Sequence, residues 1–212
     1  MLVLAFAATA LTAPAAAPVG ASPPPSAELD TPQPHRSGIV LGLTLGAGIG
    51  QASGYPNNSQ DIGDAQFYSS SGWLPGTSGT FLLMGAIADY LNFGFWFGTS
   101  SFRSGEGHAR STGVGLRVEA FPLVTLAPRF SGLGFFSEFG LGSGSLTEPN
   151  HPEAQGTQSI IGVGAFYEWS LGHILGGHLG VGPSVEYDAV FSEPLSESGL
   201  VASLRVVFYG GP

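Results

Sequence analysis

Seven ionisable side chains lie in segments whose residues alternate between apolar and small, and they are the groups best placed to do chemistry. They are Arg117, Glu119, Glu138, Glu168, His178, Glu186 and Arg205. If they point into one closed sheet, they could form a polar gate, a proton path or a structural network of ion pairs. The structural network is favoured over the gate or proton path, because an unpaired buried carboxylate is costly.

Counting residues outward from a symmetric turn predicts which of these groups lie close together in a hairpin. A symmetric turn over residues 122 to 131 places Arg117 opposite Glu138, and a similar turn over 170 to 177 places Glu168 near His178. Glutamates outnumber arginines in this set, so some carboxylates must reach water, His178 or a proton. No residue set indicates a cofactor or a resident metal.

Alternation with period two defines the elements that must position these side chains. In seven segments one face carries large apolar residues without charge, and the other is mostly glycine. Such a pattern is typical of β-strands, and a less decisive segment completes a set of eight. The segments are 39–50, 81–90, 91–98, 112–120, 133–142, 161–169, 178–187 and 200–209. We expect Leu43, Phe95, Leu116, Phe139 and Val163 to face lipid.

The composition excludes several classes of protein. The chain has 212 residues, 34 glycines, no cysteine, six Lys+Arg and 15 Asp+Glu, with a net charge of -9. Disulfide scaffolds and Cys-ligated metals are therefore excluded, and the acidic net charge argues against nucleic acid as a partner. Charged residues make up only 10%, against roughly a quarter in soluble domains.

These observations favour an all-β fold, an eight-stranded antiparallel up-and-down transmembrane β-barrel. The alternative is a soluble lipocalin-like barrel or β-sandwich, but its outer face would be polar instead of glycine-rich. In a barrel of eight strands the interior is just wide enough for side chains.

The first 36 residues have a different character from the rest. An apolar run over 1–13 followed by small residues predicts a signal peptide at 1–21, although no Lys or Arg precedes it. Residues 22–36 are rich in Pro, Ala and Ser, as in a linker. The barrel is expected at 37–209. Long connections at 52–78, 101–110, 143–156 and 188–198 would face outward, leaving both ends of the barrel on the periplasmic side.

From residue 37 to 209 the chain resembles the small eight-stranded outer-membrane barrels of the OmpA/OmpX type. The resemblance is carried by the strand pattern, the loop asymmetry and the closing segment 200–208. It implies a porin-like protein of the Gram-negative cell envelope, located in the outer membrane with the lipid bilayer as a partner. It also implies that the barrel-assembly machinery reads Leu204, Val206 and Phe208, although residues 209–212 follow the last aromatic of that signal.

The expected function is a structural or surface-binding role, in which the outward loops meet a ligand or protein and side chains mostly fill the lumen. The alternative is a small passive channel for water, ions or small solutes. An enzyme is not expected, since His178 and Ser184 lie about 20 Å apart along one strand. The first outward loop, with Tyr55, Phe67, Tyr68 and Trp73, is the most aromatic candidate for partner contact.

Overall fold

A computed structural model describes residues 36–211, apart from residue 106. The signal peptide expected at 1–21 lies outside the described residues, and so does the linker expected at 22–36, except for Arg36. Within the described part of the chain, no helix has the length and apolar character needed to cross a membrane.

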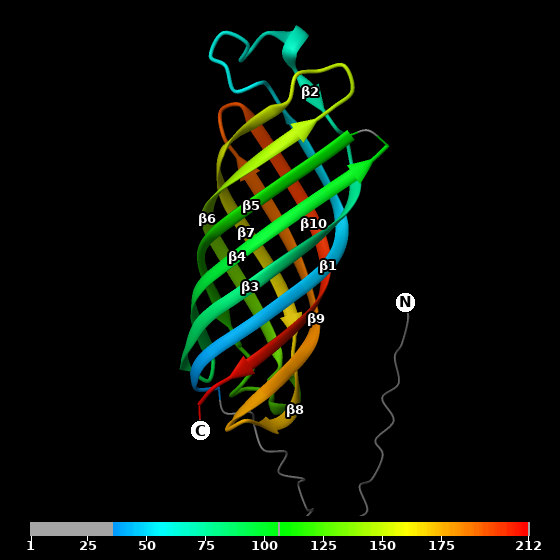
Figure 1. The fold of residues 1–212 in the computed structure, drawn as a ribbon. Coiled ribbons are helices and arrows are strands. Elements are labelled where there is room, and N and C mark those ends of the chain that lie inside the picture. The colour runs from blue at the N-terminus through cyan, green and yellow to red at the C-terminus, as the bar shows by residue number, and fades with distance from the viewer. Residues whose placement is uncertain (1–35, 106, 212) are drawn as a thin grey trace, which may run out of the picture. The chain divides into compact units, whose positions relative to one another are not determined.

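The described residues form ten strands and two short 3-10 helices. The strands make a single antiparallel sheet that closes on itself (Figure 1). Eight strands make the wall, since β10 pairs with both β1 and β9. This closure confirms the all-β, eight-stranded antiparallel barrel. The elements are β1 (Gly38–Gly54), η1 (Ala65–Phe67), β2 (Ser69–Ser70), β3 (Leu74–Ala88), β4 (Leu91–Ser104), β5 (Gly107–Ala120), η2 (Pro128–Phe130), β6 (Leu133–Thr147), β7 (Ala154–Tyr167), β8 (Trp169–Ile174), β9 (Gly177–Phe191) and β10 (Leu195–Tyr209).

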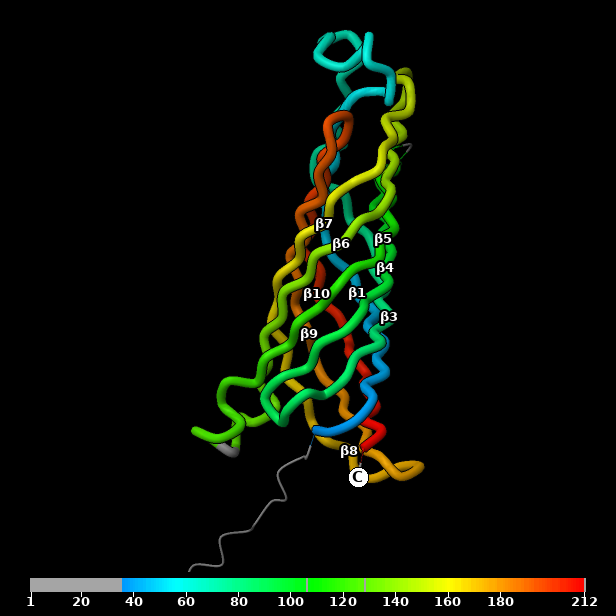
Figure 2. Tube along the Cα trace, turned by 90° about the vertical axis from the view of Figure 1, so that its left-hand side faces the viewer, coloured from blue at the N-terminus to red at the C-terminus, as the bar shows by residue number. Residues whose placement is uncertain are grey.

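The two ends of the barrel differ. At the terminal end, Gly38 of β1 lies beside the end of the chain after β10. At the loop end, the connection 55–73 contains η1 and β2, and it rises above the strands (Figure 2). Because the number of wall strands is even, the barrel begins and finishes on one side.

One predicted connection is instead a hairpin. The short strand β8 pairs with the first part of β9, and residues Leu175 and Gly176 form the turn with φ of 53° and 80°. Positive φ at both central residues is the mark of a type I′ turn, which matches the twist of the flanking strands. The tight turn shifts the register, so His173 lies opposite His178. The ladder thus pairs His178 with His173 and not with Glu168, and the proximity of Glu168 to His178 stays a prediction.

The predicted loop asymmetry is also mostly wrong. The loop-end connections are 55–73, 105–106, 148–153 and 192–194, and only the first is long, whereas the terminal end carries the connection 121–132. The strands run on where loops were expected. A backbone ladder continues whatever the polarity of its side chains, and Ser and Thr do not interrupt it.

The outward face of the wall changes character along the barrel. Leu43, Phe95, Leu116, Phe139 and Val163 point outward in the middle, with 38 to 53% of their surface exposed. We call this outward apolar zone the lipid band. Towards the loop end the same face becomes polar: Ser143 follows Leu141 on β6, and Thr112 replaces Val114 on β5.

The inward face changes in the opposite sense. Beyond the lipid band it buries an apolar cluster, which we call the loop-end core: Ala52, Leu74, Phe102, Ala109, Leu146, Ala154, Leu195 and Val201. At the level of the lipid band the inward face holds charged residues and glycine together with a second apolar cluster, which includes Val40, Leu82, Met84, Trp96 and Val207. At the loop end the wall is therefore polar outside and apolar inside, as expected if water surrounds it, whereas at the level of the lipid band the outward face is apolar and the charged side chains lie inside.

Trp96 explains part of the glycine-rich face. A Cβ atom added at Gly113 or at Gly140 would lie 2.8 Å from the indole of Trp96. The ring lies along the inner wall and packs directly on the bare backbone of β5 and β6, the two strands that follow β4 in the sheet. Side chains at these two positions would not fit beside it.

Candidate functional site

An ion-pair network centred on Glu119 fills the middle of the interior. Arg117 donates to Glu119 at 3.0 Å and to Glu138 at 2.9 Å. Arg205, which comes from β10, donates to both oxygens of Glu119 at 2.5 and 2.7 Å. Asn92 adds a fourth hydrogen bond to this carboxylate at 3.1 Å. Glu119 therefore ties together three strands of the wall from inside.

The register of β5 and β6 brings the first of these pairs together. Arg117 is the direct neighbour of Glu138 in the antiparallel ladder, which is the pair that the symmetric turn predicts. Both side chains are buried. Asn92, by contrast, is a partner that sequence reasoning missed.

Aromatic rings line the same cross-section as the arginines. The Arg117 guanidinium lies 3.4 Å from the ring centroid of Phe136, and that of Arg205 lies 4.3 Å from Phe166. Such cation–π contacts strengthen when water is excluded. Charged and aromatic side chains are thus packed together in the interior at this level.

A second polar group closes the terminal end. Glu168 is the single residue between β7 and β8. Its carboxylate accepts a hydrogen bond from the Tyr209 hydroxyl at 3.0 Å. Its oxygens also lie 3.8 Å from Arg36 and from Arg205. Arg36 donates to the carbonyl oxygens of Asp89 and Ser131 and stacks on Phe121 at 3.6 Å.

Arg36 is a buried residue of the barrel that sequence reasoning placed in the linker. Its neighbours in sequence are polar or proline and give no alternation, so no periodic signal could have identified it. His178 packs near Tyr209 and His173, with ring centroids 6.0 and 5.0 Å apart.

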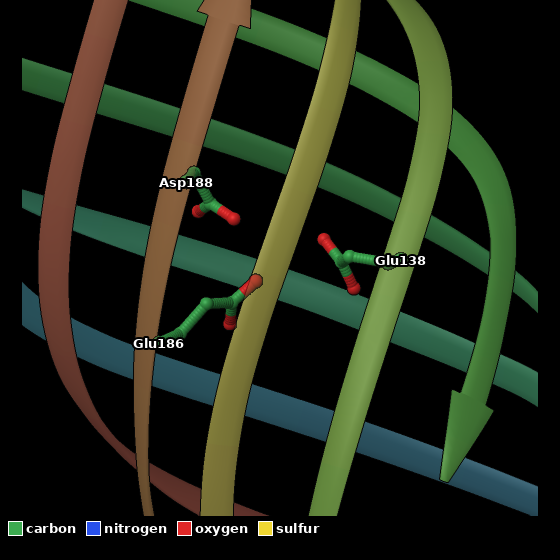
Figure 3. A group of neighbouring side chains, drawn as sticks. All are labelled: Glu138, Glu186 and Asp188. Carbon is green, nitrogen blue, oxygen red and sulfur yellow. The ribbon is translucent and has the colours of Figure 1, made fainter.

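Three carboxylates converge next to the Glu119 network. Glu138, Glu186 and Asp188 come from β6 and β9, and each offers an oxygen within 4.8 Å of the others (Figure 3). Glu138 and Glu186 are buried, and Asp188 is half-buried. Asp188 was missed because position 188 was assigned to a connection, although it shares the inward parity of Glu186.

An interior cavity of about 40 Å³ adjoins the three carboxylates. It extends toward the loop-end core, where Phe102 and Glu197 line it, and the indole of Trp96 forms part of its wall. The Glu197 carboxylate accepts hydrogen bonds from Ser100 at 3.1 Å and Ser111 at 3.3 Å. Glu197 is a further interior carboxylate that the sequence did not reveal.

A separate polar groove of about 620 Å³ lies on the outer wall at the loop end. Exposed residues of β5, β6 and β7 line it, and Asn57 of the first connection reaches its edge. Its lining includes Arg110, Thr112, Ser143, Ser145, Glu153, Gln155 and Thr157. Hydroxyl and amide groups dominate this surface, with one positive and one negative charge.

The segment expected to be read during assembly lies on β10. Leu204 is exposed on the outer face, Val206 points to the same side, and Phe208 is half-buried near the terminal end. Its recognition by an assembly machinery stays a prediction.

The closed wall, the apolar lipid band and the charged interior define a transmembrane β-barrel. The chain has the fold of the small eight-stranded outer-membrane barrels of the OmpA/OmpX type, and this confirms the resemblance seen in the sequence. It is similar to Ail, the attachment invasion locus protein of Yersinia pestis, with 9% identity and a TM-score of 0.52 over 81% of this chain and 99% of Ail.

Two further solved structures show weaker likeness. The N-terminal β-barrel domain of Pseudomonas aeruginosa OprF is 15% identical, with a TM-score of 0.42 over 82% of this chain and 98% of that domain. Neisserial surface protein A is 14% identical, with a TM-score of 0.42 over 78% of this chain and 96% of its own. No family model and no curated protein matches the sequence.

Proposed function

We propose that this outer-membrane barrel is closed to solutes and binds a polar ligand at its loop end, with no catalytic role. The barrel would be oriented with its terminal end in the periplasm and its loop end outside the cell. The proposal is carried by the charged and aromatic side chains packed across the interior, together with a groove on the wall above the lipid band.

Occlusion of the interior argues against the channel alternative. Two arginines, Glu119 and two phenylalanines share one level of the barrel, and Arg36 with Glu168 and Tyr209 forms a second barrier below it. The loop-end core adds an apolar barrier on the other side. A solute would have to displace all three.

The loop-end groove has the chemistry of a saccharide site. Its volume of about 620 Å³ falls in the range of ligand pockets, roughly 300 to 1,000 Å³. Serine, threonine and glutamine both donate and accept hydrogen bonds, as sugar hydroxyls require. Arg110 and Glu153 offset each other, so the lining favours a neutral polyhydroxylated ligand over a polyanion.

Calorimetric titration of the detergent-solubilised barrel with oligosaccharides from bacterial envelope polysaccharides would test this function. Ser145→Trp places an indole in the groove and should abolish binding. Gln51→Trp is the matched control, because β1 lies across the barrel from β6, and it should bind as the unmodified protein does. Equal affinity of the two variants, or no binding by the unmodified barrel, would refute the saccharide groove.

A further inference from the structure

The charges inside the barrel do not balance. Arg36, Arg117 and Arg205 supply three positive charges, whereas the interior carboxylates are Glu119, Glu138, Glu168, Glu186, Asp188 and Glu197. Each arginine lies within 4.0 Å of Glu119, Glu138 or Glu168. Among the described residues, Glu186, Asp188 and Glu197 form no ion pair with an arginine.

Two of the carboxylates without an arginine partner belong to the cluster in Figure 3. Glu186 and Asp188 face Glu138, with oxygens within 4.8 Å of one another. Calcium–oxygen distances of about 2.3–2.6 Å place ligands on opposite sides of one ion roughly 4.6–5.2 Å apart. The spacing of the three carboxylates therefore suits a hard cation of calcium size.

The adjoining cavity provides an independent indication of a missing ligand. Trp96 and Glu197 line it, both are more than nine-tenths buried, and the indole Nε1 and the Glu197 Oε2 have no hydrogen-bond partner. Asp188 Oδ1, in the cluster itself, also has none. A buried donor and buried acceptors without partners indicate ordered water or an ion.

The cavity has room to complete a coordination sphere. Its volume of about 40 Å³ holds about three waters at roughly 10–15 Å³ each. A calcium-sized ion takes about six to eight oxygens, which three carboxylates and these waters can supply. Trp96 N–H and Glu197 would then hydrogen-bond to the bound waters.

We propose that Glu138, Glu186 and Asp188 bind one divalent cation of calcium size inside the barrel. The ion offsets the excess negative charge next to Arg117 and fixes β9 to β6 across β7. Arg117 retains its contact to Glu138 through one oxygen, while the other oxygen of that carboxylate remains available to the ion.

Terbium is a suitable probe, because it is a calcium-sized hard cation whose emission is sensitised by a nearby indole. The full chain, folded in detergent without divalent metal, is titrated with Tb³⁺ under excitation of tryptophan. We expect sensitised emission that excess Ca²⁺ displaces. Trp96→Phe should remove most of this emission without changing the Tb³⁺ affinity measured by calorimetry, whereas Trp73→Phe at the loop end should keep it.

Substitution of the ligands gives the second arm. Glu186→Gln and Asp188→Asn should each weaken Tb³⁺ binding by about tenfold or more, because affinity follows the number of charged ligands. Glu193→Gln, in an exposed loop-end connection, is the matched control and should leave the affinity unchanged. Heat-modifiable gel mobility verifies that every variant is folded.

Three outcomes would overturn the interior site. The first is the absence of saturable Tb³⁺ binding, which would mean that the carboxylates share protons instead. The second is emission that survives Trp96→Phe but is lost in Trp73→Phe, which would place the ion on loop carboxylates. The third is an unchanged affinity in folded Glu186→Gln.

Discussion

Among the described residues, Glu119 accepts more side-chain hydrogen bonds than any other carboxylate in the interior. Four hydrogen bonds from Arg117, Arg205 and Asn92 converge on its carboxylate. Glu119 is fully buried, and so are Arg117 and Arg205. Removing one member of such a buried set leaves uncompensated charge, which costs far more than an exposed ion pair contributes.

Glu119→Gln should lower the free energy of unfolding by about 3–5 kcal/mol, because two guanidinium groups lose their shared counter-ion. Urea titration of the barrel in lipid vesicles, followed by tryptophan fluorescence, measures the loss. Glu193→Gln is the control at an exposed position and should change stability by less than about 0.5 kcal/mol. A similar small change in both variants would show that the network does not hold the wall together.

Glu138→Ala should raise the conductance of the barrel in planar bilayers above a low baseline. The substitution opens space beside Arg117 and leaves its guanidinium with Glu119 alone, so the occlusion at this level loosens. Glu153→Ala, at the outer groove, removes an acidic residue outside the interior and should have no effect. Steady conductance by the unmodified protein, indifferent to Glu138→Ala, would favour the channel alternative.

At the scale of the strands, the side chains on the outward face of β5 and β6 mark where the lipid band ends. On β5, Thr112, Val114 and Leu116 point outward in succession, and the change from hydroxyl to aliphatic falls between the first two. No bulge is recorded in the pairing of β5 with β4 or β6, so side-chain parity stays the same. The strand passes from lipid to water by composition alone.

Leu116→Arg should destabilise the barrel by about 2–4 kcal/mol, whereas Thr112→Arg should cost at most about 1 kcal/mol. The two positions share a strand and a face, and they differ in their depth in the bilayer. Equilibrium unfolding in lipid compares them directly. Equal costs would show that the lipid band extends farther toward the loop end than the side chains indicate.

Sequence periodicity was sufficient for the wall strands and for the inward position of Arg117 and Glu138, because alternation fixes parity. It was insufficient at the strand ends. Ser143 and Ser145 continue the outward face of β6, but the loss of hydropathy there looks like the start of a loop. The same cause hid Asp188, whose strand was predicted to end too early, and Glu197, whose strand was predicted to begin too late. Arg36 has no periodic neighbours at all.

The whole barrel combines two kinds of stabilisation in one continuous sheet. Every wall strand pairs on both sides, so backbone hydrogen bonds are satisfied within lipid. At the level of the lipid band the interior combines ion pairs with apolar packing, and above it the interior is the apolar loop-end core. Such a closed structure should resist detergent at room temperature.

The protein is therefore expected to fractionate with membranes and to migrate differently on a gel when boiled and unboiled. Unboiled samples keep the closed barrel and run as a compact species, while boiling opens the sheet. Recovery in the soluble fraction, with identical mobility under both conditions, would contradict the transmembrane assignment. A fully water-soluble barrel would instead require the exposed Leu43 and Phe95 to be covered by a partner.

The loop-end core has a thermal consequence. Exposing its apolar residues to water on unfolding raises the heat capacity, and the hydrophobic driving force behind it weakens on cooling. The ion pairs around Glu119 lie within the lipid band and do not depend on this force. In the cold, the loop end should therefore loosen first, so the end of the barrel that carries the proposed ligand groove gains mobility while the ion-pair network below it stays in place.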